Sequence, residues 1–303
     1  MYLLLNTSYK TEMIRKEGCI QAVKEKYPDL IIDKCTFIDQ GQNSYVAVIN
    51  DEFIFKFPRY KQVIEELKKE NIFLQKISSY ITLDIPLPYF SSFESNEVGS
   101  VFIGYKMIEG VPLEREMLYK LENKHEVAAQ ISVFLKELHG LSVGSFNDGI
   151  VEKRDGHEYW SNMLVKIKEN IFPHIREDAK EYISKTFYRF LADRENFRYE
   201  PVIIHGDLGS SNIIFDTEKK RVSGIIDFGQ VSVDDPAIDI ASLICPMGYG
   251  EDFIELILNT YPQAESLIPR ARFYVSTFAL QEALFGVETG DKEAFYSGIA
   301  PYV

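Results

Sequence analysis

The sequence predicts a two-lobed α+β protein, with a small β-rich N-terminal lobe and a larger, mostly helical C-terminal lobe. Between residues 31 and 108, short runs rich in Ile, Val and Phe alternate with polar turns, a pattern typical of strands. After residue 110 the apolar residues follow helical spacing. We therefore expect an N-terminal lobe over residues 1–105, a hinge over 106–110 and a C-terminal lobe over 111–303.

The N-terminal lobe is predicted to contain two helices and a set of short strands. The expected helices cover Ile14–Lys26 and Val63–Ser78. The expected strands are Ile31–Ile38, Tyr45–Ile49, Phe53–Phe57, Tyr89–Phe93 and Ser100–Ile108. Asn50-Asp51, between the second and third strands, has the composition of a hairpin turn.

The C-terminal lobe is predicted to be built from helices around one embedded hairpin. Periodic apolar residues predict helices over Glu126–Leu138, Phe172–Arg189, Phe253–Asn259 and Arg270–Leu284. Two β-type runs, Ile213–Phe215 and Val222–Ile226, are joined by a polar turn and predict the hairpin.

The composition limits the classes of binding partner and the cellular compartment that we expect. The chain has 46 acidic and 33 basic residues and a net charge of −13, which disfavours nucleic acid and anionic membranes. A polycationic small molecule would suit this charge, although solubility alone also accounts for it. No protein partner is implied. Three cysteines without a CxxC motif fit a reducing cytoplasm, and the apolar patch Tyr2–Leu5 is too short for a signal peptide. Met13 is an alternative start.

The segment from His205 to Gly229 combines groups that suit phosphate chemistry. Asp207 follows an apolar run, so it lies where a strand ends and a loop begins, and Asn212 comes five residues later. The predicted hairpin then returns the chain to Asp227. Because a hairpin brings its two ends together, we expect two carboxylates and a carboxamide oxygen to meet, and Mg²⁺ accepts such ligands.

A lysine in the N-terminal lobe supplies a second part of this chemistry. Lys56 lies within an apolar strand, where an ammonium group is costly to bury without a partner. Glu70 on the following helix is the expected partner, and Glu66 is the competing choice. Phosphoryl transfer uses a lysine on the phosphates, bridging metal ions and a carboxylate that accepts the proton of the attacking hydroxyl.

These motifs, taken together, resemble those of one family. HGDLGSSN (residues 205–212) is similar to the catalytic loop of aminoglycoside phosphotransferases and choline kinases, which share the protein-kinase-like fold. IIDFG (225–229) resembles their metal-binding segment, and VDDPAIDIASL (233–243) and FALQEALFGVETGD (278–291) resemble the helices that follow. INDEFIFKFP, FDTEKK and SGIIDFG are most similar to the aminoglycoside 2″-phosphotransferases. Each motif alone is common, but their joint order and spacing are specific.

The resemblance implies a role for each matching residue. Asp207 would be the catalytic base, and Asn212 and Asp227 would bind Mg²⁺. Lys56, paired with Glu70, would contact the phosphates of the nucleotide. His205 is expected to orient or pack the loop, and Asp239 to hold it in place.

The resemblance also implies a nucleotide pocket around the hinge. Tyr105 would gate the purine, and the backbone of Lys106 to Ile108 would bond its edge. Ser44, at the end of a loop over residues 40–44, would cover the phosphates, although this loop has a single glycine. In the 2″ enzymes, a bulky aromatic gate residue accompanies the use of GTP as phosphate donor. We therefore favour GTP over ATP as the donor.

The residues that would bind the acceptor are less closely specified. Acidic residues after the motifs favour a cationic acceptor, although each also reads as an ordinary surface residue. Phe278 and Phe295 stand where the 2″ enzymes carry tryptophans that line the antibiotic site. Asn212 and Gln230 replace a histidine and an acidic residue of several of these enzymes. The candidate acceptor contacts are therefore Asp234, Glu251, Asp252, Glu282, Phe278 and Phe295.

The leading hypothesis is an antibiotic kinase that transfers the γ-phosphate of GTP or ATP to an aminoglycoside hydroxyl, favouring the 2″ position. The alternative is a kinase of the same fold for another small alcohol, such as a macrolide sugar, choline or a metabolite sugar. A non-catalytic nucleotide-binding protein and a metal-dependent hydrolase are disfavoured, because the whole kinase set is present and no histidine cluster is. Only residues 230–234 separate the DFG-like segment from Asp235-Pro236, which leaves no room for the activation loop of a protein kinase.

Overall fold

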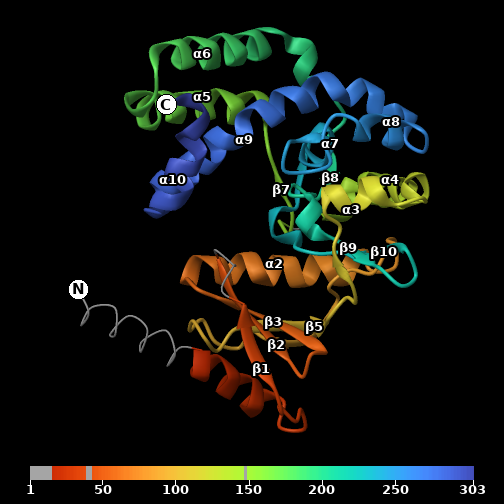
Figure 1. The fold of residues 1–303 in the computed structure, drawn as a ribbon. Coiled ribbons are helices and arrows are strands. Elements are labelled where there is room, and N and C mark those ends of the chain that lie inside the picture. Colours follow the sequence, from red (N-terminus) through yellow and green to blue (C-terminus); the bar gives the residue numbers. More distant parts are fainter. Residues whose placement is uncertain (1–15, 39–42, 147–148) are drawn as a thin grey trace. The chain divides into compact units, whose positions relative to one another are not determined.

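The computed structural model describes residues 16–38, 43–146 and 149–303, which form two compact units. The first unit comprises residues 1–111, 214–219 and 223–229, and the second comprises 112–213, 220–222 and 230–303. The first is β-rich and the second is mostly helical (Figure 1), so the predicted α+β class is confirmed. Segments 214–219 and 223–229 lie in the first unit, whereas the sequence-based division places them in the C-terminal lobe.

Five antiparallel strands form the sheet of the first unit (Figure 1). Their order is β1 (Cys35–Ile38), β2 (Ser44–Ile49), β3 (Phe53–Pro58), β5 (Phe102–Lys106) and β4 (Pro88–Ser92). Asn50 and Asp51 adopt positive φ values of 55° and 54°, which matches the twist of a tight hairpin and confirms the predicted turn. β1 is shorter than predicted because residues 31–34 form a loop whose Ile31 carbonyl accepts a hydrogen bond from Asn50.

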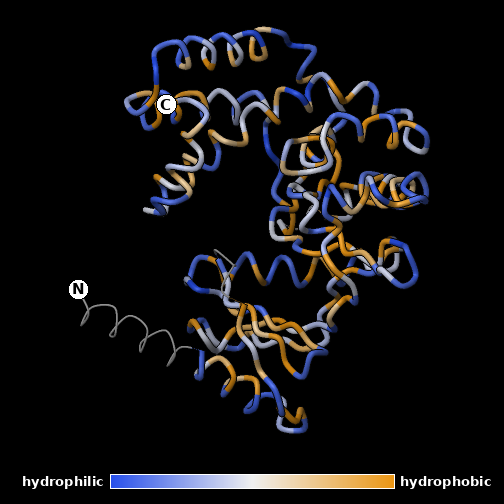
Figure 2. The backbone as a smooth tube through the Cα atoms, viewed as in Figure 1, coloured by the Kyte–Doolittle hydropathy of each residue, from blue (hydrophilic) through white to orange (hydrophobic). Residues whose placement is uncertain are grey.

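One long helix, α2 (Lys61–Ile77), packs against this sheet. Its buried positions 63, 67, 70, 74 and 77 recur every three or four residues, so one stripe of the helix faces inward. Phe55, Phe57 and Phe102 are fully buried in the core of the sheet. Figure 2 shows the hydrophobic colour concentrated in these strands. Residues 16–26 are helical, and the start of the predicted helix at Ile14 lies outside the described residues.

The second unit is built from helices and a small sheet. The sheet contains β7 (Glu152–Lys153), β11 (Ser232–Asp234) and β8 (Val202–Ile204), in that order. The chain passes between the units in the short strands β6 (Val111–Pro112), β9 (Ile213–Asp216) and β10 (Arg221–Ile225). The helices are α3 (Arg115–Lys120), α4 (Lys124–His139), α5 (Gly156–Asn170), α6 (Glu177–Ala192), α7 (Ala237–Ile244), α8 (Phe253–Leu258), α9 (Ile268–Thr289) and α10 (Lys292–Ile299).

An aromatic cluster joins three of these helices. The ring of Trp160 on α5 stacks on Tyr274 of α9 at 5.0 Å between centroids. Phe190 of α6 stacks on Phe273 of α9 at 3.6 Å. These large buried rings fix α9 against both neighbours. Within the described part of the chain, no helix has the length and apolar character needed to cross a membrane.

Candidate active site

Lys56 is the centre of an ion-pair cluster within the first unit. Its Nζ atom lies 3.0 Å from Glu70 Oε1 and 3.3 Å from Asp227 Oδ1. The side chain of Glu70 is 6% exposed because position 70 belongs to the inward stripe of α2, whereas Glu66 is exposed. Burial alone would lower the pKa of Lys56, but the two carboxylates outweigh this effect and raise it above its usual value. The group is therefore a permanent cation held between two anions.

Asp227 is presented by a strained turn. Its φ of 65° lies in the left-handed region, which costs a non-glycine residue about 1 kcal/mol or more. The next residue, Phe228, is buried and packs against Phe73 of α2, with 6.2 Å between the ring centroids. Phe228 thus anchors the turn in the core, while the side chain of the neighbouring Asp227 is 54% exposed.

The loop after β8 holds Asp207 and Asn212 together in the second unit. The Asn212 amide nitrogen donates to the backbone carbonyl of Asp207 at 2.8 Å and to its Oδ2 atom at 3.1 Å. Asn212 is 7% exposed, whereas Asp207 is exposed. His205 is fully buried, and its Nδ1 atom lies 3.3 Å from the Asp207 backbone nitrogen. This agrees with an orienting role for His205 and leaves the Asp207 carboxylate accessible.

Asp239, on the first turn of α7, fastens this loop to the core. Its carboxylate accepts hydrogen bonds from the backbone N–H groups of His205 (2.9 Å) and Gly206 (2.8 Å), and it lies 3.0 Å from His139 Nε2. Burial alone would raise the pKa of Asp239, but these interactions outweigh it and lower the pKa. Gly206 has a φ of +82°, and an added Cβ would lie 2.4 Å from the Gln230 carbonyl oxygen, so glycine is required there.

Asn212 in the second unit and Asp227 in the first each carry an oxygen atom of the kind that binds magnesium. The amide nitrogen of Asn212 is committed to Asp207, which leaves its carbonyl oxygen as the side-chain atom able to ligate. Asp227 adds a half-exposed carboxylate. One or two hard oxygen ligands of this kind are typical for Mg²⁺ beside phosphates. No cluster of three His, Cys, Asp or Glu side chains suited to a metal occurs among the described residues.

The residues expected around the nucleotide lie in the first unit. Tyr105 at the end of β5 is 8% exposed and packs with Ile64, Leu67 and Ile103, and burial raises its pKa. Lys106 is exposed and Ile108 is half-buried, while the intervening Met107 N–H donates to the Glu52 carbonyl. Ser44 is buried at the start of β2, and loop residues 40–42 lie outside the described residues.

Two of the four expected acidic acceptor contacts have partners within the protein. Asp234 is 2% exposed and accepts a hydrogen bond from Tyr199. Its carboxyl therefore stabilises the local structure and is not open to a cationic ligand. Burial raises the pKa of Asp234. Glu251 forms a two-point ion pair with Arg272, whose Nη2 atom lies 2.8 Å from Oε2.

The remaining candidates are more accessible. Asp252 and Glu282 are exposed, and Phe278 and Phe295 are half-buried. The Phe295 ring meets His174 edge to face at 5.2 Å. Phe278 and Glu282 lie four residues apart on α9 and therefore share one face of that helix.

A buried network around Asp235 was missed by sequence reasoning. Arg270 of α9 binds the Asp235 carboxylate through Nε at 2.6 Å and Nη2 at 3.0 Å, and the Tyr274 hydroxyl donates to it at 2.8 Å. The same carboxylate accepts the backbone N–H of Ala237 at the start of α7. The Asp-Pro motif marked Asp235, but nothing in the sequence identifies Arg270 as its partner.

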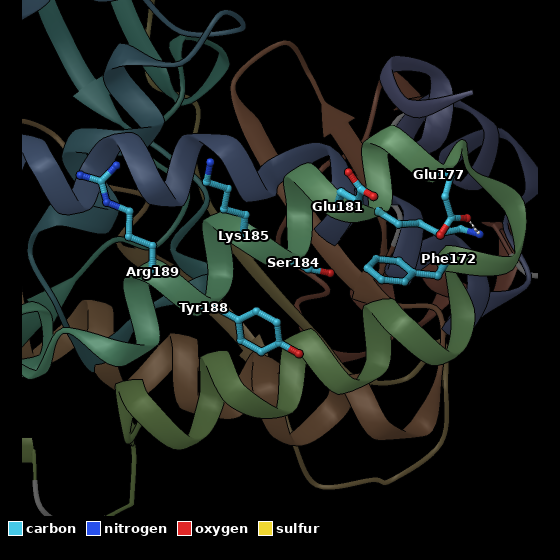
Figure 3. Close-up of a pocket in the computed structure, with 8 residues that line it drawn as sticks. Phe172, Glu177, Glu181, Ser184, Lys185, Tyr188 and Arg189 are labelled. Carbon is cyan, nitrogen blue, oxygen red and sulfur yellow. Dashed lines mark hydrogen bonds and ion pairs between the residues drawn. The ribbon is translucent and has the colours of Figure 1, made fainter.

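A hollow of about 770 Å³ lies along α6 and is lined by residues of that helix together with Phe172 (Figure 3). Its charged groups include the i,i+3 ion pair of Lys180 with Glu177. Apart from Phe172, its lining residues belong to one helix, and most of them are charged. None of the candidate site residues lines this hollow, so it is not part of the candidate active site.

A lysine paired with a helix glutamate and an accessible aspartate are groups that kinase-type phosphotransferases use. Residues 34–274 match the phosphotransferase enzyme family, and the protein belongs to that family.

Individual phosphotransferases are similar to this chain in sequence and in structure. In sequence, 199 residues are 28% identical to the viomycin phosphotransferase of Streptomyces vinaceus, covering 64% of this chain and 67% of that protein. In structure, the GDP and kanamycin complex of APH(2″)-IIIa superposes with a TM-score of 0.85 at 23% identity, over 93% of this chain and 96% of that chain. Macrolide 2′-phosphotransferase type I superposes with a TM-score of 0.75 at 19% identity, over 93% and 95%. These likenesses confirm the kinase-like fold expected from the motifs.

Glu70→Gln is expected to lower the free energy of unfolding by about 3 kcal/mol, because the buried Lys56 ammonium loses its nearest counter-charge. Chemical denaturation measures this change. Glu66→Gln, one turn earlier on the exposed side of α2, is the matched control and should change stability by less than about 0.5 kcal/mol. Equal effects of the two substitutions would contradict the assignment of Glu70 as the structural partner.

Asp239→Asn is expected to destabilise the protein in a pH-dependent way. Because folding lowers the pKa of Asp239, its charge contributes stability above the unfolded pKa of about 4, and this contribution is lost as the pH falls through the folded value. The difference in unfolding free energy between wild type and variant should therefore shrink below about pH 4. Urea denaturation at a series of pH values measures it, and a difference that stays constant would exclude a charged Asp239.

Proposed function

We propose that this protein transfers the γ-phosphate of GTP or ATP to a hydroxyl group of an aminoglycoside, with the 2″-hydroxyl as the favoured position. The observation that carries the proposal is the Lys56 cation, held jointly by Glu70 and Asp227. Kinase chemistry requires a strand lysine paired with a helix glutamate at the phosphates, and Asp227, the proposed metal ligand, lies beside the same lysine. Family membership and the kinase-like fold support the same reaction class.

In the proposed reaction, Asp207 accepts the proton of the acceptor hydroxyl. The hydroxyl oxygen forms a bond to the γ-phosphorus as the bond to the bridging oxygen breaks, and the nucleoside diphosphate leaves. Asn212 keeps the Asp207 carboxylate in one orientation through its hydrogen bond to Oδ2. Mg²⁺ bound by Asn212 and Asp227 would neutralise charge on the phosphate oxygens. Lys56 would bind the phosphates while Glu70 fixes its direction.

The proposed donor site uses the first unit. Tyr105 would bound the purine, the backbone of Lys106 and Ile108 would bond its edge, and Ser44 would lie near the phosphates. The APH(2″)-IIIa structure contains GDP, which supports a guanine nucleotide as donor. Use of a nucleoside triphosphate also suits a cytoplasmic location.

The proposed acceptor is a cationic small molecule. The net charge of −13 and the exposed carboxylates of Asp252 and Glu282 favour it electrostatically. Phe278 shares the face of Glu282 and would pack against a sugar ring, and Phe295 is the further aromatic candidate. The kanamycin named for APH(2″)-IIIa supports an aminoglycoside. The macrolide 2′-phosphotransferase supports a second candidate, another small alcohol on the same fold.

A nucleotide-consumption assay tests the reaction and the acceptor together. Kanamycin and gentamicin are expected to be phosphorylated, while choline and erythromycin are not, and chelation of Mg²⁺ should stop the reaction. Turnover of choline or erythromycin alone would reject the aminoglycoside and retain the kinase.

Asp207→Asn is expected to reduce kcat by about 10²- to 10⁴-fold, because the variant lacks the proton acceptor. Calorimetry should find its nucleotide affinity nearly unchanged, since Asp207 does not bind the nucleotide in this scheme. A variant that keeps wild-type kcat would remove Asp207 from its role as base.

Tyr105→Leu tests the nucleotide gate. The smaller side chain is expected to raise kcat/KM for ATP relative to GTP by about tenfold, because the purine pocket is widened within an apolar setting. Steady-state kinetics with both nucleotides measure the ratio. An unchanged ratio would show that another group sets the nucleotide preference.

A further inference from the structure

A side-chain hydrogen bond fastens strand β10 to the hinge within the first unit. Ser223 of β10 is half-buried, and its hydroxyl donates to the backbone carbonyl of Glu109 at 2.6 Å. The carbonyl oxygen of Ile214 on β9 lies 3.4 Å from the same hydroxyl. Glu109 comes directly after Ile108, whose backbone is proposed to bond the purine edge. The Ser223 hydroxyl therefore holds the hinge one residue beyond the proposed base-binding backbone.

A backbone pairing holds the outer edge of the same strand. β10 lies at the edge of its sheet, beside β9. On its outer side, the Asp84 N–H donates to the Ser223 carbonyl at 3.2 Å, and the Ile225 N–H donates to the Asp84 carbonyl at 2.9 Å. A Cβ at Gly224 would lie 2.3 Å from that Asp84 oxygen and 3.0 Å from Ile108 Cδ1, so glycine permits this close approach. β10 is thus held at Asp84 as well as at the hinge.

The strand that is held in this way leads to Asp227. Asp227 comes two residues after Ile225, the last residue of β10. Its Oδ1 atom lies 3.3 Å from Lys56 Nζ, the cation proposed to bind the phosphates. The position of β10 against the hinge therefore sets the separation between the base-binding backbone and the charged groups proposed to act at the phosphates.

A nucleotide gains affinity from a fixed separation of these two places. Its purine and its phosphates belong to one molecule, so binding of one part raises the effective concentration of the other at its own place. The gain is largest when the protein holds both places at the span of the ligand, because little ordering is then needed on binding. A ligand that occupies one place alone has no such gain to lose.

We infer that Ser223 is a positioning residue for the phosphate donor. Its hydroxyl keeps the hinge and the turn at Asp227 at one separation, so that the purine and the phosphates of one nucleotide are bound together. Ser223 acts through Glu109 and β10 and contacts neither part of the nucleotide. The role concerns the donor alone, and it rests on the proposed kinase function.

Ser223→Ala removes the hydroxyl that holds the hinge. Displacement of a fluorescent GDP analogue, with Mg²⁺ present, measures the affinity for three competing probes, which are GDP, guanosine and pyrophosphate. GDP is expected to bind about fivefold more weakly than to the wild type, which is the size of effect that one lost hydrogen bond produces. Guanosine and pyrophosphate should each change by less than about twofold, because each occupies one place alone.

Two further variants serve as controls. Ser223→Thr keeps the hydroxyl on a residue that suits a strand, and it is expected to bind GDP as the wild type does. Ser161→Ala is the matched control, because Ser161 is also half-buried and its hydroxyl also donates to a backbone carbonyl, that of His157 at 2.7 Å. Ser161 lies on α5 of the second unit, and its replacement should leave all three affinities unchanged.

The outcomes separate the positioning role from the function. Unchanged GDP affinity in Ser223→Ala would overturn the positioning role, and so would an equal loss for all three probes, which indicates general damage to the pocket. Weak GDP binding by Ser223→Thr would overturn it too, because the hydroxyl would then not be the group that matters. In each of these cases, nucleotide binding by the wild type retains the proposed function. If the wild type binds neither GDP nor ADP, the function and the positioning role both fall.

Discussion

The buried carboxylate of Asp239 is the interaction on which the rest of the second unit depends. It is fully buried and would be costly there without partners. Two backbone N–H groups of the loop after β8 and His139 of α4 supply those partners. The charge therefore joins α4, α7 and the loop that carries Asp207 at one point.

The same constraint recurs at two other buried charges. Asp235 satisfies its carboxylate with Arg270 and Tyr274, which ties α9 to the start of α7. Lys56 satisfies its ammonium with Glu70 and Asp227, which ties α2 to the strained turn at Asp227. Each charge has several partners on different elements, so a shift of one element would leave a charge unpaired at a cost of several kcal/mol.

The sequence could predict what depends on local patterns. The Asn50-Asp51 turn and the strands on either side follow from turn chemistry and apolar runs, and the choice of Glu70 over Glu66 follows from the inward stripe of α2. The apolar pattern did not predict α5, and α7 was expected only through the resemblance of residues 233–243 to a helix of the family. α7 is buried nearly all round, so no polar face marks it in the sequence. Partners distant in sequence, such as Arg270 for Asp235, depend on how helices pack and leave no local signal.

The acidic acceptor contacts show why net charge is a poor guide to a binding site. Asp234 and Glu251, two of the candidate contacts, are bound by a tyrosine and an arginine of the same unit, and the neighbouring Asp235 is bound by an arginine. A carboxylate that is already paired offers a ligand cation little, because the cation must displace the existing partner. The charge of −13 therefore overstates the capacity to bind a polycation. In the proposed site, attraction of a cationic acceptor would depend on carboxylates that are exposed, such as Asp252 and Glu282.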